Sequence, residues 1–379
     1  MSLNDWQSLC VGRDNEKQLL KDAWAKAKSG QPGFVVLRGE SGFGKTTLVK
    51  ELYSWLSQNE NEDPDGYWPD TLKNNNDSLN INPSKEDFSN SNSIPYLWWG
   101  IRWKGGERNK VEGNSCALIE QKNHLVSHKN ALEYKKREYD RGQKSGKLIA
   151  QLLGSLLPVN IVDIAINITE QVESYKNEKI EQLEQNFTIE EMQKKLNGEE
   201  TANLFAFFEE LLDENYTKVP SIPLIMILDD AQWADEESLR VIDKLFEMAT
   251  ERKFKLLIVA THWEAEWYKQ ANSNQNKNLP TIFNRLKLFT EHQQLSNVME
   301  IIDCGKVSEL DIILKQALPG LTENQRSIIL KKVDGNPLMM QEVILYFLRE
   351  PLYFMSENPN QALSCVGEEK INIIPSDLV

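Results

Sequence analysis

The stretch Gly39-Glu40-Ser41-Gly42-Phe43-Gly44-Lys45-Thr46 fits the phosphate-binding pattern G-x-x-x-x-G-K-[ST]. The apolar run at 33–38 before it predicts a buried strand, and residues 47–55 after it predict an amphipathic helix. Its glycines let the backbone curl so that successive N–H groups face the β- and γ-phosphates of a nucleotide. The lysine adds a positive charge and the threonine a hydroxyl for Mg²⁺. We therefore expect nucleotide contacts from Gly39, Gly42, Gly44, Lys45, Thr46 and Thr47.

Composition is typical of a globular protein and argues against a broad nucleic-acid-binding face. The 379 residues suffice for two or three domains of ordinary size. The net charge of −14 opposes the phosphate neutralisation on which nucleic-acid affinity depends, and the basic residues 135–137 are more typical of a solvated helix face. Four scattered cysteines indicate free thiols in a reducing compartment, and no secretory signal is visible. These features predict a cytoplasmic location.

The second strong pattern is the apolar run 223–228, which ends in Asp229 and Asp230. A run of this kind predicts a central parallel strand whose C-terminal end faces the ligand. One carboxylate there can hold the Mg²⁺ shell, for which Asp229 is the candidate, and Asp230 can act as general base on the attacking water. The run 256–262 predicts a neighbouring strand, whose Thr261 can contact the γ-phosphate or the water.

Residues 58–200 contain inserted material, because the chain between the two motifs is longer than a plain core needs. Within it, residues 58–92 are dense in Asn, Asp, Ser and Pro, a composition that favours a long surface loop without fixed structure. Residues 115–143 show a helical and heavily charged pattern. The role of this insertion does not follow from its composition.

Two other stretches allow alternative interpretations. Residues 95–103 predict an aromatic strand, whose tryptophans pack against the core more readily than they stack on nucleic-acid bases. Residues 148–168 are apolar enough to suggest a membrane span. They include Asp163, which is costly inside a bilayer, and Pro158, which breaks a helix, so two buried helices fit this stretch better.

Together these motifs resemble a STAND ATPase, the signal-transducing branch of the AAA+ P-loop proteins, whose bacterial members are grouped with an Orc-like AAA ATPase domain. The resemblance rests on Val11-Gly12-Arg13 with Glu16, the phosphate loop, the string Asp229-Asp230-Ala231-Gln232-Trp233-Ala234-Asp235, the strand ending at Thr261, and Gly335-Asn336-Pro337. It implies an α/β P-loop NTPase core with a parallel sheet flanked by helices, plus a small C-terminal helical lid.

The resemblance also implies site residues and a division of the chain. Val11, Gly12 and Arg13 are expected to flank the adenine, and Pro337 to close over the base from the lid. Lys45, Asp230 and Thr261 are the expected catalytic residues, with Thr46 and Asp229 holding Mg²⁺. The expected parts are an N-terminal lead-in at 1–30, a core at 31–290, a lid at 291–370 and the start of a truncated winged-helix segment at 371–379.

These patterns predict a switch that binds ATP or ADP with Mg²⁺, hydrolyses ATP slowly and engages a protein partner or itself on activation. The resemblance suggests bacterial signalling or antiviral defence. Relatives commonly carry an Arg roughly where Trp263 stands, so turnover is slow or the charge comes from elsewhere. The alternatives are a DNA-associated AAA+ loader, a nucleotide-binding scaffold without catalysis, and a membrane-inserted ATPase.

Overall fold

The computed structural model describes residues 9–60, 81–82, 96–103, 118, 125–126, 208, 212, 221–263 and 299–349. Most of the predicted insertion, all of the apolar stretch 148–168, and the C-terminal segment 371–379 lie outside these residues. Within the described ranges, no helix is long and apolar enough to cross a membrane.

Six strands of the described ranges form one sheet in the order β3-β2-β4-β5-β1-β6. All neighbours are parallel except β3, which pairs antiparallel with β2. This arrangement confirms the predicted parallel α/β core and places the C-terminal ends of the phosphate-loop strand and the acid-bearing strand at one edge. The strands are β1 (Gly33–Arg38), β2 (Leu97–Arg102), β3 (Leu125–Val126), β4 (Leu224–Asp229), β5 (Leu256–His262) and β6 (Met299–Asp303).

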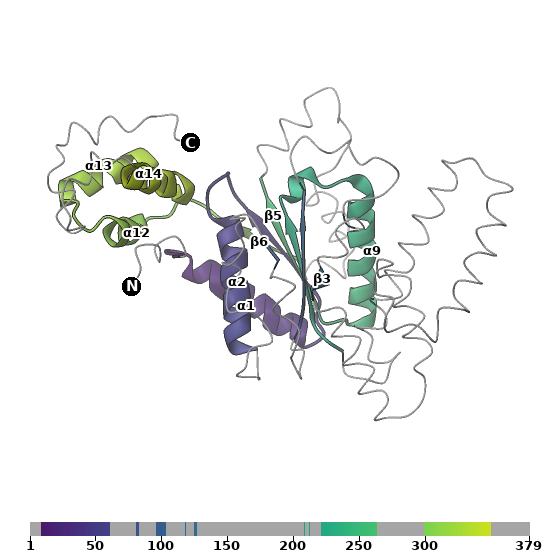
Figure 1. Cartoon of the computed structure of the whole chain (residues 1–379). Helices are drawn as coiled ribbons and strands as arrows, with labels where there is room; N and C mark the ends of the chain where they lie inside the picture. Colours follow the sequence, from purple (N-terminus) through teal and green to yellow (C-terminus); the bar gives the residue numbers. More distant parts are fainter. Residues whose placement is uncertain are drawn as a thin grey trace, which may run out of the picture.

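Helices cover both faces of the sheet. Helices α1 (Asp14–Lys28) and α2 (Lys45–Asn59) lie on one face and α9 (Glu236–Arg252) on the other (Figure 1). Phe34 of β1 meets Phe246 of α9 edge-on, with 5.6 Å between ring centroids. Strands covered on both faces must be apolar along their whole length, which explains the continuous apolar runs of β1, β4 and β5.

The aromatic side chains of β2 pack into the core. Trp98 and Trp99 are fully buried. The Trp98 ring meets Tyr53 of α2 edge-on at 4.9 Å, and the Trp99 ring lies 5.7 Å from that of Phe208. The prediction that these tryptophans pack the sheet is therefore confirmed, since buried rings cannot stack on bases of a bound nucleic acid.

Two segments differ from the sequence-based expectation. Residues 125–126, predicted as helical, form β3, because pairing with Trp98 and Trp99 of β2 outweighs a local helical pattern. The strand β6 falls inside the range assigned to the lid, yet it pairs with β1 and extends the core sheet. Its five residues include two acids, so no long apolar run indicated a strand there.

The small C-terminal helical unit has a core of its own. Helices α12 (Leu310–Ala317), α13 (Glu323–Val333) and α14 (Pro337–Arg349) lie together to one side of the sheet (Figure 1). They enclose buried side chains that are separate from those of the sheet. A capping box between Thr322 and Gln325 starts α13. Half-buried Leu9 and Val11 pack against this second core, so the N-terminal segment joins the lid to the rest of the chain.

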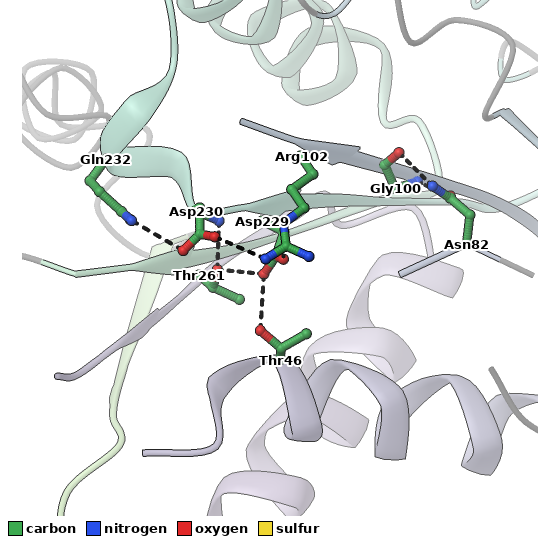
Figure 2. Close-up of polar contacts among 8 residues, drawn as sticks. All are labelled: Thr46, Asn82, Gly100, Arg102, Asp229, Asp230, Gln232 and Thr261. Atoms are coloured by element: carbon green, nitrogen blue, oxygen red, sulfur yellow. Dashed lines mark hydrogen bonds and ion pairs between the residues drawn. The ribbon is translucent and has the colours of Figure 1, made fainter. Parts of the chain in front are cut away.

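Within residues 58–92, whose composition predicts a surface loop without fixed structure, Ile81 and Asn82 contact the sheet. Strand β3 pairs with Trp98 and Trp99 of β2, and the next residue of β2, Gly100, pairs with the side-chain amide of Asn82 instead. Asn82 Oδ1 accepts from Gly100 N at 2.7 Å, and Asn82 Nδ2 donates to Gly100 O at 2.9 Å (Figure 2). Ile81 is 2% exposed, and its carbonyl accepts from the Trp98 indole.

We expect Gly100→Ala to lower the free energy of unfolding by about 1–3 kcal/mol. A Cβ at this position would lie 2.6 Å from Asn82 Oδ1 and 2.9 Å from Ile81 Cδ1, which displaces both residues. Urea titration of the purified variant measures the change. Gly305→Ala is the matched control, because among the described atoms none lies within 4 Å of its added Cβ. Equal effects of the two substitutions would contradict this account of the contact.

Candidate functional site

The phosphate loop leads directly into α2. Gly44 precedes the helix with φ 80°, and Gly42 has φ 83°, a region that favours glycine. The first turn of α2, which carries Thr46 and Thr47, contains no acidic residue, and no side chain of the described ranges caps it. By contrast, Asp235 caps α9. The N-terminal N–H groups and dipole of α2 are therefore available to an anion.

Lys45 lies folded over the loop that precedes it. Its Nζ donates to the carbonyls of Gly39 and Glu40, both at 2.8 Å, and the residue is 8% exposed. Burial lowers the pKa of Lys45, while the carboxylates of Asp230 and Asp229 act in the opposite direction. The loop carbonyls therefore hold the ammonium group, and the charges of the acid pair favour its protonated form.

Asp229 is the buried member of the acid pair. Its Oδ1 accepts from Thr46 Oγ1 at 3.2 Å and from Thr261 Oγ1 at 2.8 Å (Figure 2). Its Oδ2 accepts no hydrogen bond from the described residues but lies 3.6 Å from Arg102 Nε. Burial raises the pKa of Asp229, as does the charge of Asp230. The site thus joins α2, β4 and β5 through one carboxylate.

Asp230 is the more accessible member, with its side chain 33% exposed against 1% for Asp229. It has φ 56°, which ends β4, and its N–H donates to Thr261 Oγ1 at 2.8 Å. Its Oδ1 accepts from Gln232 Nε2 at 3.1 Å, and its Oδ2 lies 3.5 Å from Arg102 Nη2. Thr261 thereby fixes both acids, by accepting from the backbone of one and donating to the carboxylate of the other.

The acid string contains residues to which sequence reasoning gave no role. Gln232, 2% exposed, holds Asp230 with its amide nitrogen and accepts from Trp263 N at 3.0 Å with its amide oxygen. Asp235 caps α9 by accepting from Ser238 N at 2.8 Å, and it also accepts from Trp103 Nε1 at 3.2 Å. Only the appearance of these residues in a recognised string could have drawn attention to them.

The N-terminal motif and the lid both touch the phosphate loop. Arg13 is 5% exposed; it donates to Phe43 O at 3.1 Å and to Gly305 O, and pairs with Glu16 at 2.7 Å. It follows Val11 and Gly12, which has φ 62°. The structure therefore places this motif between the loop and the segment that leads from β6 into the lid.

On the lid side, the residues flanking Pro337 contact the loop. Leu338 N donates to Gly42 O at 3.2 Å, and Asn336 Nδ2 donates to Ser41 O at 3.4 Å. A Cβ on Gly42 would lie 2.6 Å from Asn336 Oδ1. The start of α14 thus rests directly on the loop, and a larger residue at Gly42 would force the two apart.

His262 ends β5 beside the loop and predicts a pH dependence of stability. It is 2% exposed, and burial, followed by the charges of Lys45 and Arg38, lowers its pKa from 6.5 to about 4. Between these values the unfolded chain binds more protons than the folded one, so stability rises with pH in this window and is lost as pH falls from 6.5 toward 4. The full effect is on the order of 3 kcal/mol.

We expect His262→Gln to flatten this acid-side loss. Urea unfolding of wild type and variant at several pH values between 4 and 7 measures the free energy of unfolding of each. Subtracting the two values cancels the contributions that carboxyl groups make equally to both proteins. The two stability curves should converge as the pH falls. Curves that stay parallel over the whole range would show that His262 does not cause the loss.

Comparison with known families adds a match that covers α1, the phosphate loop and α2. Residues 9–83 match the AAA ATPase domain family. No curated protein matches the chain. The likeness implies binding of nucleotide, usually with Mg²⁺, and ATPase activity. The N-terminal part of the chain is therefore similar to an AAA ATPase domain, and the fold built around it is that of a P-loop NTPase core.

Proposed function

We propose that this protein binds Mg·ATP, hydrolyses it slowly and acts as a nucleotide-dependent switch. The observation that carries the proposal is the meeting of the phosphate loop with the acid pair, where Thr46 Oγ1 lies 3.2 Å from Asp229 Oδ1. A hydroxyl from the loop and a carboxylate from the neighbouring strand end are the groups that hold a nucleotide-bound Mg²⁺ in P-loop enzymes. The AAA ATPase match over residues 9–83 supports the same conclusion.

In this proposal the loop binds the phosphates and the N-terminal motif binds the base. The backbone N–H groups near Gly39, Gly42 and Gly44 and the first turn of α2, with Thr47, surround the phosphates, and Lys45 turns its ammonium toward them. Val11, Gly12 and Arg13 flank the adenine, with Pro337 on the lid side. The contacts of Arg13 with Phe43 and Gly305 support this placement.

The residues at the acid pair fit Mg²⁺. Thr46 and Asp229 offer hard oxygen ligands, and buried Asp229 Oδ2 accepts no hydrogen bond from the described residues, so it can accept one from a water of the metal shell. When bound, the ion neutralises charge on the β- and γ-phosphates. We therefore assign Asp229 to the binding of Mg²⁺.

Asp230 is assigned the general base. Water attacks the γ-phosphorus, its proton passes to the Asp230 carboxylate, and the bond to the bridging oxygen breaks, which leaves ADP and inorganic phosphate. Gln232 holds the Asp230 side chain and Thr261 holds its backbone, so the carboxylate is fixed before the water arrives. Its greater exposure suits contact with water, whereas Asp229 is closed in.

The lid supplies the proposed switch. Leu338 and Asn336 bond to carbonyls of the phosphate loop, so a change in the loop on nucleotide binding or release reaches α14 directly. We propose the lead-in, core and lid as the functional parts, with the core extended through β6. Signalling or antiviral defence through a protein partner or self-association is proposed on the resemblance of the acid string, and the acidic net charge of −14 opposes a DNA-bound role.

Release of inorganic phosphate from ATP, with Mg²⁺ or with EDTA, tests this function. We expect slow turnover that requires Mg²⁺ and is not stimulated by DNA. Chromatography of nucleotide released on denaturation identifies the bound form. Turnover stimulated by DNA would favour a loader, and bound nucleotide without any turnover would favour a scaffold.

A further inference from the structure

The residue that follows β5 connects the phosphate loop to the acid string. Trp263 donates from its indole Nε1 to Glu40 Oε2 at 2.6 Å and from its backbone N to Gln232 Oε1 at 3.0 Å. Gln232 in turn donates from Nε2 to Asp230 Oδ1 at 3.1 Å (Figure 2). Three hydrogen bonds in series therefore join the second residue of the phosphate loop to the proposed general base.

The donors and acceptors of this series fix the orientation of the Gln232 amide. A backbone N–H can only donate, so Trp263 N selects the amide oxygen of Gln232 and leaves the amide nitrogen to face the Asp230 carboxylate. An amide turned the other way would place its oxygen against that carboxylate. Gln232 is 2% exposed, so water has little access to replace either partner. The position of Trp263 therefore determines how Gln232 meets Asp230.

The loop end of the series is held through both backbone and side chain. Glu40 O accepts from Lys45 Nζ at 2.8 Å, and the Glu40 carboxylate accepts from the Trp263 indole. The preceding residue, Gly39, donates from N to His262 O at 3.2 Å, so two successive loop residues bond to two successive residues at the tip of β5. A hydrogen bond to a carboxylate is roughly twice as strong as one between neutral groups. The loop therefore anchors Trp263.

We propose that Trp263 is a positioning residue that holds Asp230 in register with the phosphate loop for the attack of water on ATP. This inference rests on the proposed function. Water must attack in line with the bond that breaks, so the base after β4 and the loop after β1 have to keep a fixed separation. Strand β5 lies between β4 and β1 in the sheet. Trp263 at its tip bonds to both sides, to Glu40 directly and to Asp230 through Gln232.

Trp263→Phe removes the indole N–H but keeps an aromatic ring and the backbone N–H. Single-turnover phosphate release measures the chemical step, and separate titrations with ATP and ADP measure binding. We expect release to slow by about tenfold, the order of effect of one hydrogen bond to a charged group. Both affinities should stay within about threefold of wild type, because the loop backbone and Lys45 are unchanged. A lower rate with unchanged affinity separates positioning of the base from a general loss of the site.

Glu40 variants test the same hydrogen bond from the loop side. Glu40→Gln drops the charge but keeps an oxygen that can accept from the indole, so release should stay within about threefold of wild type. Glu40→Ala removes the acceptor and should slow release by about tenfold, as Trp263→Phe does. Glu40 is exposed, so its variants decide the matter even if Trp263→Phe does not fold. The double variant should be no slower than either single variant, because both remove one bond.

Trp24→Phe is the matched control, because the Trp24 indole also donates to a carboxylate, Glu60 Oε1 at 2.8 Å, but at the C-terminal end of α2. Its turnover should equal that of wild type. Wild-type release rates in Trp263→Phe or in Glu40→Ala would overturn the inference, and so would equal losses in Glu40→Gln and Glu40→Ala, or losses that multiply in the double variant. In each case wild-type turnover leaves the proposed function intact. A wild-type protein that releases no phosphate would refute that function, and the inference with it.

Discussion

Lys45→Ala is expected to weaken ATP binding by about 100-fold or more, because a charge-assisted bond to phosphate at a desolvated site is lost. The buried ammonium bonds to two carbonyls of the phosphate loop, so the substitution removes a positive charge from the loop itself. Calorimetric titration with Mg·ATP measures the change. Burial lowers the pKa of Lys45, so the folded protein spends free energy to keep this ammonium group charged.

The same substitution should therefore leave the fold in place, and urea unfolding serves to check this. Lys315→Ala is the control, because Lys315 is exposed and pairs with Asp311 at 2.6 Å within the lid helix α12. It should bind ATP like wild type. Retained ATP affinity in a folded Lys45→Ala protein would contradict the assignment of the loop as the phosphate site.

Asp230→Asn is expected to spare ATP binding and to reduce turnover by about 10²–10⁴-fold, the usual contribution of a general base. Asparagine tolerates the left-handed backbone that Asp230 adopts at φ 56°, and it can still bond to Gln232, so the change removes the base with little strain. Asp230→Ala should give the same loss of turnover, with an added cost in stability. Phosphate release under single-turnover conditions measures the rate.

Asp235→Asn provides a contrast within the same acid string. Asp235 caps α9 through Oδ1, which asparagine retains, but its Oδ2 accepts from Trp103 Nε1, which an amide nitrogen cannot do. The substitution should therefore lower the free energy of unfolding by about 1 kcal/mol without abolishing turnover. If Asp230→Asn turned over ATP at the wild-type rate, Asp230 would not be the base, whatever the behaviour of Asp235→Asn.

Much of the core could be predicted because each element carries its own signal. The strands β1, β4 and β5 are buried on both faces and therefore read as unbroken apolar runs that end in polar residues. The short strands β3 and β6 carry no such run, and only their partners β2 and β1 make them strands. Such pairing over a long chain separation cannot be read from local pattern.

The same distinction applies to the site. Lys45, Thr46, Asp229, Asp230 and Thr261 stand in patterns whose spacing indicates their chemistry, and the structure brings them to one edge of the sheet. Arg102 and Asn82 stand in no motif. Their positions depend on the register of β2 beside β4 and on where the insertion returns to the sheet, which become visible only in three dimensions.

Equilibrium dialysis of the purified wild-type chain against radiolabelled ATP with Mg²⁺, after removal of any nucleotide carried through purification, tests the central claim most directly. We predict saturable binding of one nucleotide per chain, with Lys45→Ala retaining no label at the same concentrations. A wild-type chain that holds no nucleotide when ATP is in millimolar excess would contradict the account.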